Sequence, residues 1–138
     1  MRPPQTRAKT QPDRIQGRQF HLTFAALYPG ELSFEAFRAA ACKWAGDSRE
    51  LLEHSTGREK HKEPADPDRD EHFHVYVHYN KKIDIRNRRT TLHFDLEGQN
   101  GRTLHPEVQK VGPTPKDRER VIKYGMKDGD FDQRPAFR

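Results

Sequence analysis

Glu71-His72-Phe73-His74-Val75-Tyr76-Val77-His78-Tyr79 is the stretch that decides the fold. Apolar and polar residues alternate along it, as they do in a β-strand with one buried face. One face carries Phe73, Val75, Val77 and Tyr79, and the other carries His72, His74, Tyr76 and His78. The stretch therefore predicts a strand that packs on a core with one side and presents a pair of imidazoles with the other.

Further strands and two helices are predicted around this strand. The strand candidates are residues 19–25, 50–60, 91–96 and 107–111, and turns are expected at 29–30 and 98–101. Ser33 is the predicted N-cap of a helix that runs to about Trp44. Thr114-Pro115 opens a second helix that Gly129 would close. Strands separated by hairpin-length gaps predict an α+β fold with a central antiparallel sheet of about five strands and flanking helices.

Composition bounds the class of protein. The chain has 138 residues, of which 31% are hydrophobic and 34% charged, and a net charge of +5. Residues 1–17 read as a flexible basic arm, and residues 18–138 as one domain with a small core. The charge suits a polyanion partner, although many solvated basic proteins share it. A single cysteine, Cys42, excludes a disulfide framework, and the absence of a long apolar run predicts a protein that is neither membrane-spanning nor secreted.

His72 and His74 are candidate ligands of one metal ion. Two imidazoles and one carboxylate would leave coordination positions open for a phosphate and water, which suits Mn²⁺ or Mg²⁺ in a catalytic site. Carboxylates cluster just before the strand at Glu59, Glu63, Asp66, Asp68, Asp70 and Glu71. The competing interpretation is two polar residues on the solvent side of a sheet, preceded by a solvated acidic loop.

Tyr124 is a candidate nucleophile. A phenol has a pKa of about 10 and needs a neighbouring cation or a metal-bound phosphate to react near neutral pH. Lys127 and Asp128 follow it by three and four residues, on the same face of the predicted helix. The competing interpretation is an amphipathic helix with a terminal charge pair.

A basic segment after the histidine strand is a candidate contact for a nucleic-acid backbone. It holds Lys81, Lys82, Arg86, Arg88 and Arg89. Each residue alone is equally well explained as solvated surface, whereas the block favours phosphate contact. The chain has no phosphate-binding loop of the ATPase type.

Three motifs, in order, resemble the HUH endonuclease domain of the replication initiator (Rep) proteins of small circular single-stranded DNA viruses. Residues 20–23 (FHLT) resemble the first motif, residues 72–74 (HFH) the histidine–hydrophobic–histidine motif, and residues 124–127 (YGMK) the Tyr-x-x-Lys motif. Residues 92–96 and 105–109 resemble the extra block of geminivirus-like members. The resemblance covers about residues 18–131.

The resemblance implies a role for each matching residue. Tyr124 would be the nucleophile, with Lys127 in support, and His72 and His74 would be metal ligands. Glu59, in the context Arg58-Glu59-Lys60-His61, would be the third ligand, with Glu63 as the alternative because residues 62–71 form a longer loop than is usual. Asp128 is a further candidate for the active site. Phe20, His21, Thr23 and His93 would join the basic segment in contacting DNA.

The resemblance also implies the activity. It predicts an enzyme that nicks single-stranded DNA at a stem-loop replication origin through a 5′-phosphotyrosine, rejoins ends and initiates rolling-circle replication. The full-length protein would continue into a helicase region, through which it would oligomerise, and would work in the host nucleus if the virus is eukaryotic and in the cytoplasm otherwise. The alternatives are a non-catalytic module that binds single-stranded nucleic acid and a metal-dependent nuclease that uses water.

Overall fold

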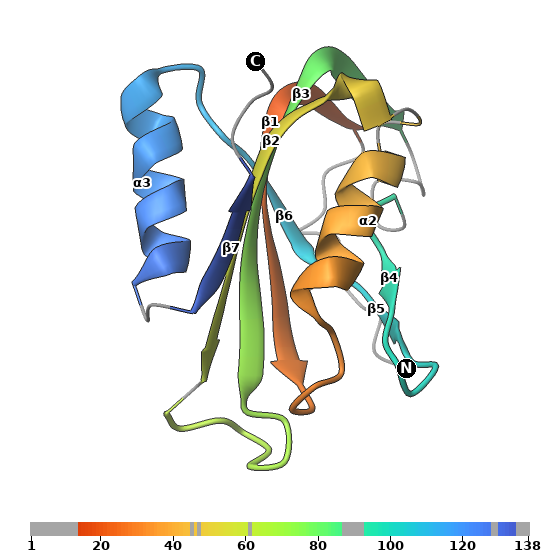
Figure 1. Ribbon diagram of the computed structural model, residues 1–138, viewed down its shortest axis with the longest axis vertical. Coiled ribbons are helices and arrows are strands. Elements are labelled where there is room, and N and C mark those ends of the chain that lie inside the picture. Colours follow the sequence, from red (N-terminus) through yellow and green to blue (C-terminus); the bar gives the residue numbers. More distant parts are fainter. Residues whose placement is uncertain are drawn as a thin grey trace, which may run out of the picture.

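Two helices flank a five-stranded antiparallel sheet in the part of the chain that the structure describes (Figure 1). The computed structural model describes residues 14–44, 46, 48–60, 62–86, 93–127 and 130–134. Its elements in chain order are β1 (Arg14–Leu27), α2 (Phe34–Trp44), a 3₁₀ turn (Ser48–Glu50), β2 (Leu51–Lys60), β3 (Glu71–Arg86), β4 (Leu96–Glu97), β5 (Thr103–Leu104), β6 (Glu107–Lys110), α3 (Pro115–Met126) and β7 (Phe131–Arg134). The predicted α+β fold with a central antiparallel sheet is confirmed.

The predicted histidine strand, β3, lies at the centre of the sheet. The strand order is β6-β1-β3-β2-β7, and every pair of neighbours is antiparallel. β4 and β5 form a separate two-stranded ribbon. β7 was not predicted, because Phe131 is the only apolar residue among its four and no alternation is visible. Its pairing with β2 makes it a strand.

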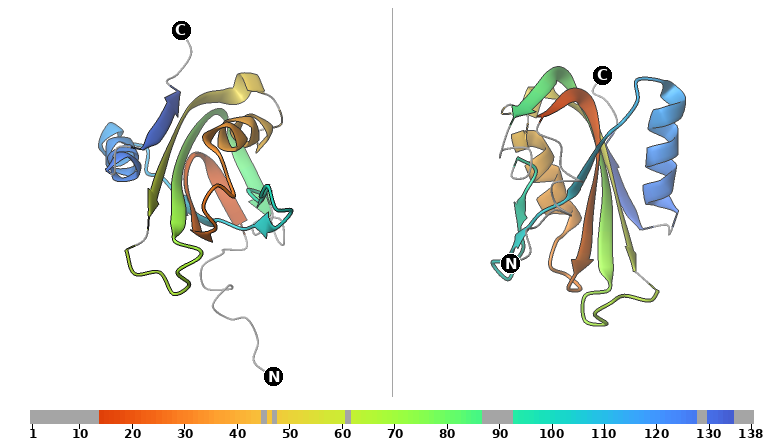
Figure 2. Two further views of the ribbon diagram at one scale, coloured as in Figure 1. Left: turned by 60° about the horizontal axis from the view of Figure 1, so that its bottom comes forward. Right: turned by 180° about the vertical axis from the view of Figure 1, so that it is seen from behind.

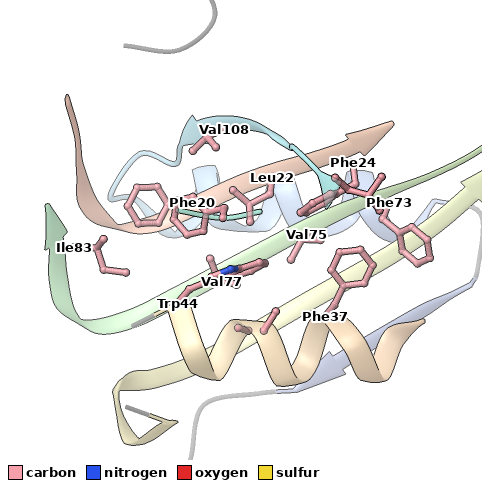
Figure 3. Close-up of a cluster of buried hydrophobic side chains, with 14 of the residues drawn as sticks. Phe20, Leu22, Phe24, Phe37, Trp44, Phe73, Val75, Val77, Ile83 and Val108 are labelled. Atoms are coloured by element: carbon pink, nitrogen blue, oxygen red, sulfur yellow. The ribbon is translucent and has the colours of Figure 1, made fainter. Parts of the chain in front are cut away.

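The face of the sheet that meets α2 holds the main hydrophobic core (Figure 3). β1 and β3 supply more of it than any other elements, and their alternating residues Phe20, Leu22, Phe24, Phe73, Val75, Val77 and Tyr79 lie at its centre. The centroid of the Phe37 ring of α2 lies 4.7 Å from that of Phe73 and 5.2 Å from that of Phe24. The apolar stripe of α2 is therefore buried on the apolar side of the sheet, as the two periodicities predict.

The opposite face is covered by α3 (Figures 1 and 2). A smaller apolar cluster attaches this helix, with Tyr76, Val111 and Ile122 buried and Val121 and Met126 packed against them. In Figure 2 the long strands curve around α2, and α3 lies on their outer side. The polar residues of β3 therefore lie beneath a helix, where His74 and Tyr76 are buried.

Both predicted helix starts are confirmed by their caps. The Ser33 hydroxyl accepts a hydrogen bond from the Ala36 amide at 3.1 Å, one residue before the first turn of α2. The Thr114 hydroxyl accepts from the Asp117 amide at 3.2 Å, and Pro115 is the first residue of α3. Each cap satisfies an amide that has no partner within its helix. α3 ends at Met126, and Gly129 lies outside the described residues.

The first strand begins at Arg14, four residues before the predicted domain boundary between residues 17 and 18. The prediction was wrong there because Ile15 is a single apolar residue in a basic, proline-containing segment. In the structure Ile15 is buried and pairs with Ile85 of β3. The Arg14 guanidinium donates to both carboxylate oxygens of Asp84, at 3.0 and 2.9 Å. Residues 1–13 of the predicted arm lie outside the described residues.

Two other predicted boundaries differ from the structure. β3 continues to Arg86, so Lys81, Lys82 and Arg86 belong to the strand and do not follow it. The strand predicted over residues 91–96 is replaced, where described, by a turn at 93–94 and by β4 at Leu96–Glu97. The alternation there reflects burial of Phe94 against the rings of Phe20 and Trp44, with centroids 5.4 and 5.2 Å away. Neither described helix is long and apolar enough to cross a membrane.

Candidate metal centre and active site

Glu59, His72 and His74 meet on the α3 face of the sheet. Glu59 is directly opposite His72 in the β2–β3 ladder, and alternation places His74 on the same face. The carboxylate oxygen Oε1 of Glu59 bonds to Nε2 of His72 and lies 3.1 Å from Nε2 of His74. One ligand atom from each residue lies within 4.8 Å of the other two.

The chemistry of these three donors fits a divalent cation. Two imidazole nitrogens are directed at one carboxylate oxygen, and the three side chains are largely withdrawn from water, with exposed fractions of 14% for His72, 8% for His74 and 11% for Glu59. Imidazole and carboxylate are common ligands of catalytic divalent metals, and three protein ligands leave positions for substrate oxygens. Among the described residues, this is the group of histidines and carboxylates that could hold a metal ion.

The protonation states of the group favour cation binding. Burial alone would raise the pKa of the Glu59 carboxyl, but hydrogen bonds with His72, His74 and Lys127 outweigh it and lower that pKa to about 2. Burial also lowers the pKa of His74 to about 4, although the hydrogen bond with Glu59 acts in the opposite direction. At neutral pH the carboxylate is therefore charged and His74 neutral, which are the forms that bind metals.

Helix α3 brings Tyr124 and Lys127 to this group from about 50 residues further along the chain. The Tyr124 ring packs edge-on against His74, with centroids 4.6 Å apart, and 47% of the residue is exposed. The Lys127 ammonium lies 4.2 Å from the centre of the Tyr124 ring and 3.2 Å from Oε2 of Glu59. A phenol, an ammonium group and the candidate cation site thus converge at the C-terminal end of α3.

His21 of β1 contacts His74 and is partly buried. Nε2 of His21 is 3.3 Å from Nδ1 of His74, and the His21 ring also hydrogen-bonds with the side chain of Gln109. Burial lowers the pKa of His21, against the effect of the Gln109 hydrogen bond. A histidine that binds a metal through Nε2 is usually held by a partner at its other nitrogen. His21 is in the place of such a partner, while Thr23, on the same face, is directly opposite His74 in the β1–β3 ladder.

A groove of about 320 Å³ opens beside Tyr124, between β6 and α3. Its lining includes His21 and Gln109 from the sheet, Tyr124 at one wall, and the cations Lys110 and Arg120. The volume is at the lower end of the range for small-ligand sites. Sequence reasoning did not single out Lys110, Gln109 or Arg120, because isolated polar residues carry no signal until β6 and α3 are placed side by side.

Several predicted site residues are not at this site. Phe20 was predicted to contact DNA, but it is fully buried in the core on the α2 face, because it alternates with His21. His93 bonds through Nε2 to the backbone carbonyl of Trp44 at 2.8 Å and packs against Phe94, also on the α2 side. Glu63 is exposed in the loop between β2 and β3 and is not part of the three-residue group.

The predicted basic segment lies at the other end of β3 from His72. Lys81, Lys82 and Arg86 are exposed there, and Arg86 is 3.5 Å from Asp84. Arg88, Arg89 and Asp128 lie outside the described residues. Lys127, which the sequence indicated, lies next to Tyr124, but the other cations of the groove beside Tyr124, Lys110 and Arg120, do not belong to the predicted basic segment.

Neither the scan against protein-family models nor the search of curated proteins finds a match for this chain. A function for this chain therefore has to be inferred from the chemistry of the site.

Proposed function

We propose that this chain is a metal-dependent endonuclease that nicks and rejoins single-stranded DNA through a covalent tyrosine intermediate, like the Rep domains that its motifs resemble. The observation that carries the proposal is the contact of Tyr124 with His74, with Lys127 between Tyr124 and Glu59. The consecutive strands β2 and β3 contribute to this arrangement together with α3, which comes much later in the chain. A purely structural helix would have no need of a half-exposed phenol beside the neutral His74 and a largely covered carboxylate.

The metal would be Mn²⁺ or Mg²⁺, held by Glu59, His72 and His74. When bound, such a cation would polarise the scissile phosphate and offset its negative charge. The ligands prepare the site for it: Glu59 keeps its charge down to a pH of about 2, and burial keeps His74 neutral.

Tyr124 is the nucleophile of the proposed reaction. Its phenolic oxygen attacks phosphorus, the bond from phosphorus to the 3′ oxygen breaks, and the phenolic proton is lost to water while the 3′ oxygen gains a proton. The products are a 5′-phosphotyrosine and a 3′-hydroxyl. Lys127 stabilises the negative charge that develops on the phosphate during the attack, because its ammonium lies close to the Tyr124 ring.

The same residues support rejoining. A 3′-hydroxyl that attacks the phosphotyrosine releases Tyr124 and restores one phosphodiester bond. One phosphoester bond is broken and one is formed in each direction, so no ATP is required.

The proposed substrate is a single strand at a stem-loop replication origin. The groove beside Tyr124 is lined by two cations, by hydrogen-bonding side chains, by the carboxylate of Asp117 and by the apolar Val111 and Val121. This mixed lining suits the phosphate and the base of a nucleotide that flanks the scissile phosphate. The net charge of +5 favours encounter with DNA. The work of the enzyme would be the initiation of rolling-circle replication, in the nucleus of a eukaryotic host or in the cytoplasm of a bacterial one.

Incubation with 3′-labelled single-stranded oligonucleotides of random sequence, followed by denaturing electrophoresis, tests the proposal. With Mn²⁺ we expect label that migrates with the protein and resists boiling in detergent, and we expect chelation to remove it. Cleavage without a protein-linked label would indicate a nuclease that uses water. Binding without cleavage would indicate a non-catalytic single-strand-binding module. Either result would contradict the proposed mechanism.

A further inference from the structure

Helix α3 touches the sheet at one point where two glycines meet. A Cβ atom built on Gly57 of β2 would lie 1.6 Å from the carbonyl oxygen of Gly125 in α3, 2.4 Å from its carbonyl carbon and 3.0 Å from its Cα. No side chain fits in that space, and the obstacle is helix backbone that cannot rotate away. The backbone of α3 therefore rests directly on the backbone of β2.

This contact lies in the middle of the candidate site. Gly57 is opposite His74 in the β2–β3 ladder and precedes Glu59 by two residues on the same strand. Gly125 directly follows Tyr124 and precedes Lys127 by two residues. The contact thus links the strands that carry the cation-binding group to the turn of helix that carries the phenol and the ammonium.

We propose that Gly57 is a positioning residue: its missing side chain sets how closely Tyr124 and Lys127 approach Glu59, His72 and His74. This inference rests on the proposed function. Other contacts hold the rest of the helix, since Ile122 is buried and Arg118 bonds to both carboxylate oxygens of Glu53 at 2.5 Å. A methyl group at position 57 would therefore lift the C-terminal turn of α3 while the helix stays attached.

The two glycines are not equivalent, and this provides a matched control. A Cβ on Gly125 would lie 3.5 Å from the Cβ of His74 and 3.6 Å from its carbonyl oxygen, which are ordinary packing distances. Neither glycine has a positive φ, so backbone conformation does not explain either residue. The two substitutions differ only in the space around the added methyl group: there is no room for it in Gly57→Ala, and there is room for it in Gly125→Ala.

Steady-state cleavage of a substrate oligonucleotide separates positioning from stability. For Gly57→Ala we expect kcat to fall by about 100-fold, since a displacement of about 1 Å at a reacting group can cost that much. KM for DNA and the affinity for Mn²⁺ measured by calorimetry should stay within a few-fold of the parent, because the strand residues are unchanged. Gly125→Ala should match the parent in all three. A parental kcat in Gly57→Ala, an equal loss in Gly125→Ala, or a parallel loss of Mn²⁺ affinity would overturn the proposal.

Two further measurements keep the test decisive. If Gly57→Ala does not fold, Gly125→Val replaces it. The methyl groups of that valine must fit against His74, so kcat should fall while the fold is kept. A parental kcat in Gly125→Val would count against the proposal. Paramagnetic broadening of the Tyr124 ring signals by Mn²⁺ requires no cleavage and should weaken in Gly57→Ala but not in Gly125→Ala. A parent that binds Mn²⁺ but never cleaves would overturn the proposed function, whereas equal broadening in both variants would overturn the role of Gly57.

Discussion

The two faces of the central sheet differ in what they bury. The α2 face holds a continuous apolar cluster that includes the fully buried Phe37 and Phe73. The α3 face holds the histidine pair, Glu59 and Glu53, and only a small apolar cluster around Ile122. Burial of apolar side chains stabilises the fold mainly on the first face. The second face therefore has polar groups available for chemistry, and it contributes less to the stability of the fold than the first face does.

The attachment of α3 reflects this difference. In place of a broad apolar stripe it uses one buried isoleucine, the Arg118–Glu53 ion pair and the close contact of Gly57 with Gly125. The ion pair and the close backbone contact both depend on geometry, so they fix the position of the helix, whereas the small apolar cluster contributes little to stability. If this account is correct, substitutions on the α3 face should change activity and substitutions on the α2 face should change stability.

The largest effect is expected at Tyr124. Tyr124→Phe removes the attacking oxygen and keeps the ring that packs on His74, so cleavage and the covalent adduct should be abolished. The free energy of unfolding should change by less than about 0.5 kcal/mol, because the residue is half exposed. Denaturing gels and urea unfolding measure the two quantities. Tyr28→Phe, at an exposed tyrosine on another part of the surface, is the control and should cleave normally. An adduct formed by the Tyr124 variant would place the nucleophile elsewhere.

The opposite pattern is expected for Phe37→Ala. Phe37 is fully buried between Phe24 and Phe73, so its truncation should lower the free energy of unfolding by about 3–5 kcal/mol. Urea denaturation measures this loss. The fraction that remains folded should bind Mn²⁺ with parental affinity, because α2 lies on the opposite face of the sheet from Glu59, His72 and His74. A marked loss of Mn²⁺ affinity in the folded protein would show that the two faces are coupled.

A smaller effect should distinguish the two candidate carboxylates. Glu59→Gln removes the charge between His72 and His74, and the Mn²⁺ concentration for half-maximal cleavage should rise by at least about tenfold. Glu63→Gln should resemble the parent, because Glu63 is exposed in the loop. A Mn²⁺ titration of both variants measures the difference. If only Glu63→Gln shifts the requirement, the third ligand has been assigned wrongly.

The smallest effect concerns the pH dependence of the ion pair under α3. Burial would raise the pKa of Glu53, but the hydrogen bonds from Arg118 outweigh it and lower that pKa. A lowered pKa adds stability above the ordinary glutamate value of about 4.3, and this stability is lost as the pH falls. Arg118→Met should therefore be less stable than the parent by about 1 kcal/mol at neutral pH, since Arg118 is partly exposed. Measured by urea unfolding, the difference in the free energy of unfolding between Arg118→Met and the parent should become smaller below about pH 4. A difference that becomes larger there would contradict this account.

Much of the local structure follows from short sequence patterns. Alternation along residues 71–79 predicts both faces of β3, and the Ser33 and Thr114 caps predict where the helices start. The same alternation separates Phe20 from His21, although the resemblance to a family motif led to both being predicted as DNA contacts. Gly57 carried a weaker signal, since a lone glycine within a strand often marks a close approach of another backbone. β7 and the start of β1 carried none, because single apolar residues in polar segments show no period.

The sequence by itself determined which side chains share a face of each strand and where each helix begins, because backbone geometry alternates side chains at a period of two and helix caps act within four residues. It also contained the candidate donors and the tyrosine–lysine pair. Only the tertiary structure decided that Glu59 pairs with His72 while Glu63 stays in the loop, since strand register depends on contacts between distant segments. Only it decided that α3 covers the polar face, where the Gly57–Gly125 contact brings Tyr124 and Lys127 to His74 and Glu59.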